Sequence, residues 1–129
     1  MAVMIDQDNQ DADDGVWAKF RGSEFKIVHS GNAKFQRALS RLQAPHRRKI
    51  EKGSMDPVES KDLICTAMSE GLVIGWRGVI DSSKNEVPFS RASCATALKN
   101  NSDLREFVQE FAVDLDNFRV EQLENEGNV

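Results

Sequence analysis

Residues 31–53 read GNAKFQRALSRLQAPHRRKIEKG, and they combine a helical apolar stripe, a proline break and the densest basic run of the chain. The stripe recurs at helical spacing, which predicts a helix with one face able to pack. It consists of Phe35, Ala38, Leu39 and Leu42. Asn32 is a suitable N-cap, Pro45 removes a backbone donor, and Gly53 is a natural stop. We therefore expect a kinked or broken helix that ends in a cationic knob.

The complementary face of this stretch is basic. Its cations are Lys34, Arg37, Arg41, Arg47, Arg48, Lys49 and Lys52. Such a cluster can steer and anchor an oppositely charged partner, or it can be an ordinary solvated face. The charge pattern alone leaves both interpretations open.

The composition fits one compact domain, because 129 residues with 40% hydrophobic content can bury a single moderate core. The net charge of -4 hides a segregation along the chain. Residues 19–52 carry ten cations against two acids, whereas residues 101–129 carry eight acids against two cations. Such a dipolar chain can pair its own ends, or it can pair head to tail with a copy of itself and form a homo-oligomer.

We divide the chain into three parts. Residues 1–14 contain five acids and no base, which predicts a disordered acidic leader. Residues 15–123 form the predicted single domain, and residues 124–129 form a frayed tail. The two cysteines, Cys65 and Cys94, fall in predicted helices without close spacing, so we expect buried thiols.

The predicted domain is mainly α (α+β), with a small β-hairpin at Val16–Val28 followed by about four helices. Alternating apolar residues in GVWAKF and EFKIVH flank a short turn, as in hairpins. The basic stretch is the first helix, and Asp56 with Pro57 starts a second one, expected to run to about Ile74. A short extended arm through Phe89 separates it from two more helices. These are expected at about residues 90–98 and 102–123.

No catalytic or metal-binding pattern is found in the sequence. His29, His46 and the two cysteines lack the close spacing of a zinc site. A glycine-rich phosphate loop and a serine elbow are also missing. We therefore expect no enzyme and no cofactor. No apolar run approaches the roughly 18 residues that cross a bilayer, so no membrane partner is expected.

In their order, several segments resemble a tail assembly chaperone of long-tailed, siphovirus-like bacteriophages. The resemblance covers roughly Gly15 to Phe118, and its parts include GVWAKF, EFKIVHSGNAKFQRAL, APHRRKIEKG, LVIGWRGVID, NEVPFS and DLREFVQEFAVDLDNFR. The most specific pieces are PHRR, WRGVID, VPFS and the closing DNFR. Family members often have glycine between the strands near Asp81 and Val87, where this chain has Asn85 and Glu86.

The resemblance implies a non-catalytic late protein that binds the tape measure protein, keeps it soluble and helps the tail tube polymerise around it. Such a protein acts in the host cell cytoplasm and is absent from the mature virion. A frameshifted longer product often recruits the tail tube protein in such families. Because the basic cluster lies within the similar segments, we expect the partner-binding residues to be Arg37, Arg41, Arg47, Arg48, Lys49 and Trp76.

Two alternative functions remain. One is a structural or connector protein of tail morphogenesis that stays in the virion. The other is a nucleic-acid-binding protein that uses the basic segment 34–52. A pI near 5.2 and the acidic ends of the chain disfavour binding to a polyanion.

Overall fold

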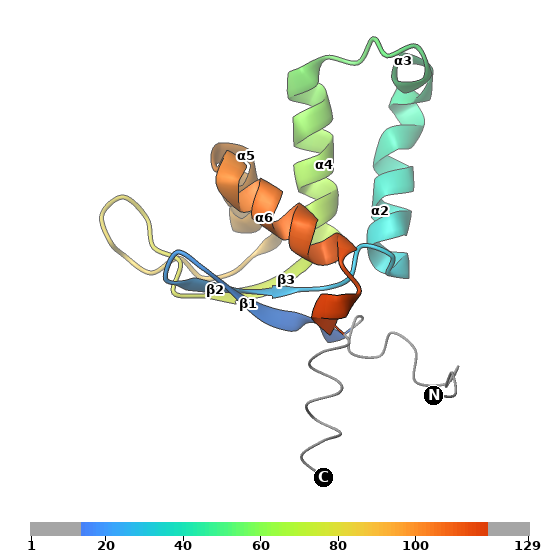
Figure 1. Cartoon of the computed structure of the whole chain (residues 1–129). Helices are drawn as coiled ribbons and strands as arrows, with labels where there is room; N and C mark the ends of the chain where they lie inside the picture. The colour runs from blue at the N-terminus through green and yellow to red at the C-terminus, as the bar shows by residue number, and fades with distance from the viewer. Residues whose placement is uncertain (1–13, 119–129) are drawn as a thin grey trace, which may run out of the picture.

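The structure is a computed structural model that describes residues 14–118, and it confirms the predicted α+β class. Helices cover one face of a three-stranded antiparallel sheet (Figure 1). In chain order the elements are β1 (Val16–Phe20), β2 (Ser23–Ile27), α2 (Ala33–Gln43), the 3-10 turn η2 (Ala44–His46), α3 (Arg47–Glu51), α4 (Pro57–Gly71), β3 (Val73–Arg77), α5 (Arg91–Asn100) and α6 (Ser102–Val113).

The predicted hairpin is confirmed and gains a third strand. In β1 and β2, Val16 pairs with Ile27 and Phe20 pairs with Ser23, which leaves a two-residue turn. Part of the predicted extended arm forms β3, which pairs antiparallel with β2. A register shift between Lys26 and Ile27 interrupts this second ladder, so the buried residues of β3 do not alternate regularly.

A helical hairpin is inserted between two neighbouring strands. The chain leaves β2, runs along α2, η2 and α3, and returns along α4 into β3, so that the hairpin projects away from the sheet (Figure 1). At its base, Val28 N–H donates to the Leu72 carbonyl at 2.8 Å. The break at η2 confirms the kink predicted from Pro45. The basic run therefore lies at the far end of the projection.

Two contacts hold α2 against the end of α4. A Cβ atom at Gly71 would lie only 2.5 Å from the Cα of Phe35, so the two backbones approach closely there. Asn32 caps α2 by accepting from the Phe35 N–H at 2.9 Å. Its amide group also donates to the Gly71 carbonyl at 2.9 Å, which fixes one end of the pair.

Two helix ends differ from the prediction. The helix predicted to reach Ile74 ends at Gly71, because Val73 already pairs with Ile27 in the sheet. The last helix, predicted to continue to about residue 123, ends at Val113 because Asp114 has extended dihedrals. This bend brings the ring of Phe118 to 5.5 Å from that of His29 and packs it against Val16.

Other predictions concern residues outside the described range. The acidic leader lies outside it except for Asp14, and the frayed tail at 124–129 lies outside it completely. The domain limits of 15 and 123 thus stay predictions. No helix within residues 14–118 has the length and apolar character needed to span a bilayer.

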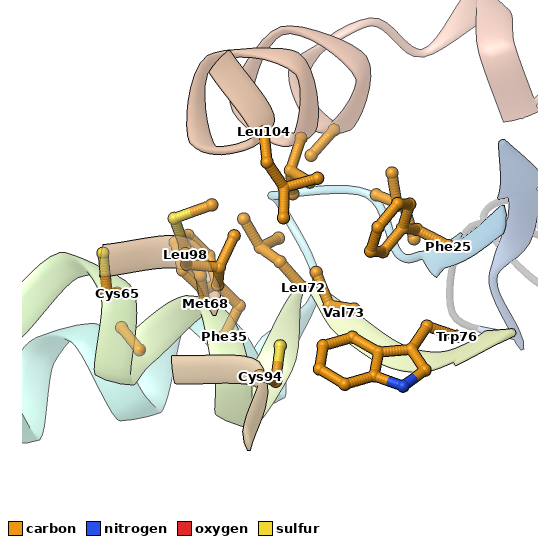
Figure 2. Close-up of a cluster of buried hydrophobic side chains, with 14 of the residues drawn as sticks. Phe25, Phe35, Cys65, Met68, Leu72, Val73, Trp76, Cys94, Leu98 and Leu104 are labelled. Carbon is orange, nitrogen blue, oxygen red and sulfur yellow. The ribbon is translucent and has the colours of Figure 1, made fainter. Parts of the chain in front are cut away.

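The core lies between the sheet and the helices (Figure 2). Its largest fully buried side chains include Ile27, Met68, Leu72 and Leu98. Cys65 and Cys94 are buried free thiols, as predicted. Burial raises the pKa of both thiols, that of Cys94 to about 12. Neither thiol is therefore activated as a nucleophile.

Candidate partner-binding surface

The helical hairpin carries the exposed cations predicted to bind a partner: Arg37 and Arg41 lie along α2, and Arg47, Arg48 and Lys49 lie at the far end on α3. We name Arg37, Arg41, Arg47, Arg48 and Lys49, together with Ile50 and Val58, the basic hairpin surface. Arg37, Arg47 and Arg48 are exposed, and none of the three forms an ion pair within residues 14–118. Their guanidinium groups are thus free to meet an external acid.

Two of the predicted cations also have partners inside the fold. Both oxygens of the Glu70 carboxylate accept from Arg41, at 2.7 and 2.8 Å, which connects α2 to α4. Lys49 lies 4.0 Å from the Glu59 carboxylate, a longer contact between α3 and α4. The Arg41 side chain is still 62% exposed. Arg41 can therefore hold α2 against α4 and still contact a partner.

Apolar side chains accompany these cations. Ile50 on α3 is 39% exposed, and Val58 in the first turn of α4 is 59% exposed. Large apolar groups exposed beside charged ones can supply contact area in a protein interface, while the charges set orientation. Ile50 was not predicted as a contact residue, because it lies in a short helical segment after the proline. The apolar pattern after Asp56 predicts Val58 in the core, and the structure shows instead that Val58 is exposed.

Trp76 does not lie on the basic hairpin surface, which corrects its place among the predicted contact residues. Its side chain is buried at 9% exposure, and its indole N–H donates to the Val87 carbonyl at 2.8 Å. The ring also meets Phe25 and Phe89 edge to face, with centroids 6.2 and 5.3 Å away. Trp76 is therefore part of the core, as Figure 2 shows.

A second exposed surface was missed by the sequence analysis. The sheet face opposite the helices presents the side chains of Trp17, Lys19, Glu24, Lys26, Ile74 and Arg77, which we name the outer sheet face. The Arg77 guanidinium lies 3.9 Å from the centre of the Trp17 ring and donates twice to Glu24, each time at 3.1 Å. The hydrogen bond from Arg77 lowers the pKa of Glu24. Strict alternation in VWAKF was the available signal, since it places Trp17 opposite the buried Val16 and Ala18.

Comparison with known proteins identifies a phage family. The family model described as YdaY prophage protein matches residues 30–128, a range that includes the helical hairpin, β3, α5 and α6. Neither the curated proteins nor the solved structures gave a match. Because the family model covers most of the sequence, the chain belongs to the YdaY prophage protein family and is of phage origin.

Proposed function

We propose that this phage protein is a tail assembly chaperone that binds and solubilises the tape measure protein and promotes polymerisation of the tail tube. Membership of a prophage family and the resemblance of its ordered segments support this proposal. The observation that carries it is the basic hairpin surface. That surface offers guanidinium groups that form no ion pair within residues 14–118, together with exposed Ile50 and Val58, on an element that projects from the core.

The proposed contact is non-catalytic. A tape measure protein is a long, largely helical chain with apolar stripes, and a helix of this kind can pack along another helical element. Ile50 and Val58 would cover apolar positions of the client, while Arg37, Arg47 and Arg48 would attract neighbouring acids. Individually weak contacts gain avidity when several copies bind along one client. Such a chaperone prevents aggregation without enclosing its client.

The proposal also covers the location of the protein and its second partner. It would work in the host cell cytoplasm, and it would leave before the virion is complete. The tail tube protein would be a second partner, recruited through a frameshifted longer product. A structural or connector protein would instead remain in purified particles, which mass spectrometry of virions distinguishes.

Co-expression with the tape measure protein of the same phage tests the proposal directly. The client is expected to be soluble with this chain and to aggregate without it. Unchanged solubility of the client would contradict the chaperone function. If nuclease treatment then removes a tightly held polynucleotide from the purified chain, the nucleic-acid alternative replaces it.

Charge reversal tests the surface itself. The Arg47→Glu/Arg48→Glu variant should associate with the client about ten-fold more slowly and with weaker salt dependence, since close cations accelerate encounter. The fold should be retained because exposed charges contribute little to stability. Lys84→Glu/Arg91→Glu is the matched control, because it makes the same change in charge at exposed positions away from the hairpin. Equal slowing by both variants would exclude a specific role for this surface.

A further inference from the structure

The outer sheet face is an exposed surface that the proposed function leaves unused. Its two apolar side chains, Trp17 and Ile74, are each 37% exposed, and Gly75 lies between them without a side chain. Lys19, Lys26 and Arg77 surround them, against the single acid Glu24. Helices α2, α4, α5 and α6 do not cover this face, because they lie on the other side of the sheet (Figure 1). The face is therefore partly apolar and positively charged.

The position of Arg77 indicates which ligands suit this face. An exposed tryptophan on a sheet can stack with nucleic-acid bases. Here the guanidinium of Arg77 already occupies one side of the Trp17 ring, and Glu24 holds it there. The rest of the exposed area comes from the other parts of the Trp17 ring, the Ile74 side chain and the two lysines. This combination favours a polypeptide with acids around an apolar group.

The chain itself offers such a surface on α6. Glu106, Glu110 and Val113 follow one another at helical spacing on the exposed side of this helix, and Val113 is 64% exposed. Neither glutamate forms an ion pair within residues 14–118. The preceding acid, Asp103, is already paired with Arg21 at 2.6 Å. We name Glu106, Glu110 and Val113 the α6 stripe.

We propose that the outer sheet face of one copy binds the α6 stripe of a second copy, with Val113 against Trp17 and Ile74 and the two glutamates against Lys19 and Lys26. The helix packs on the inner side of the sheet, so the two surfaces lie on opposite sides of one chain and cannot meet within it (Figure 1). The interface is therefore heterologous, and each added copy presents another free sheet face and another free stripe. This association does not depend on the client or on the basic hairpin surface.

Sedimentation of two complementary variants tests the proposal. Lys26→Glu alters only the sheet face, and Glu110→Lys alters only the α6 stripe. Each variant alone should self-associate at least ten-fold more weakly than the unmodified chain, whose own association should weaken with salt. Mixed in equal amounts, they should associate again, because the intact stripe of one meets the intact sheet face of the other. Restoration on mixing also shows that both variants are folded.

Arg47→Glu/Arg48→Glu serves as the control and should associate like the unmodified chain. The inference is overturned if the unmodified chain stays monomeric at both low and high salt. It is equally overturned if mixing restores nothing, or if the control loses association while Lys26→Glu retains it. Self-association without client binding would leave this interface intact and contradict only the proposed function.

Discussion

Replacing Gly71 with alanine tests the closest contact in the fold. Gly71 is the last residue of α4, and it does not have positive φ, so alanine suits its backbone. Helix propensity alone would make the variant up to about 1 kcal/mol more stable. However, the added Cβ would lie 2.5 Å from the Cα and 2.6 Å from the N of Phe35. Both are backbone atoms, so a change of rotamer cannot relieve the overlap.

The expected loss of stability follows from the displacement of α2 relative to α4. Separating α2 from α4 by about 1 Å is an overpacking strain of about 1–3 kcal/mol. It also stretches the Asn32 bond to the Gly71 carbonyl, now 2.9 Å, which is worth about 1 kcal/mol. After subtracting the gain in helix propensity, we expect a loss of about 1–3 kcal/mol in unfolding free energy. For a chain of this size that lowers Tm by roughly 10 °C.

Urea and thermal denaturation measure this effect, and Gly75→Ala is the matched control. At Gly75 the added Cβ would be 3.8 Å from the Cβ of Lys26 and 3.9 Å from Trp17, which are ordinary contacts. The control should change stability by less than about 0.5 kcal/mol. If Gly71→Ala is as stable as the unmodified chain or more so, the proposed close approach of α2 and α4 is wrong.

Two further variants test local features. Arg21→Asn should raise stability by about 0.5 kcal/mol in thermal denaturation, because Arg21 and Gly22 have φ values of 49° and 82°, as in the turn that prefers Asn-Gly. This gain exceeds the small contribution of the exposed Arg21–Asp103 ion pair. A clear loss of stability would show that the ion pair dominates. Burial raises the pKa of Cys94 from 9.0 to about 12, so the unfolded chain loses this proton first and stability should fall as pH rises above 9. Urea titrations should show that the unmodified chain loses about 2 kcal/mol of its stability advantage over Cys94→Ala between pH 8.5 and 10.5. A constant difference between the two chains would mean that the thiol ionises normally in the fold.

Local signals predicted the starts of elements well. Asn32 and Asp56 accept backbone N–H groups at the helix starts where the sequence placed them, because a cap depends on only a few neighbouring residues. The hairpin with its short turn was predicted for the same reason. The exposed cations of the hairpin were also located correctly, since a basic helix face rarely becomes buried.

Features that depend on distant residues were not predictable in this way. The burial of Trp76 depends on its pairing opposite Phe25 of β2, which the sequence of β3 alone does not contain. The end of α6 depends on Phe118 packing against Val16, at the other end of the described chain. Similarly, the outer sheet face becomes a single surface only when β3 joins the hairpin.

The insertion of the helical hairpin between β2 and β3 also bears on the order of folding. The first two strands need to close only a two-residue turn, whereas the third must return across residues 28–72 before it can pair. Packing of α2 on α4 shortens this search, because it brings Leu72 beside Val28, where their backbones bond at 2.8 Å. We therefore expect α2 and α4 to pack together in the transition state and the β2–β3 ladder to form after it. The helical hairpin would then govern how fast the sheet is completed.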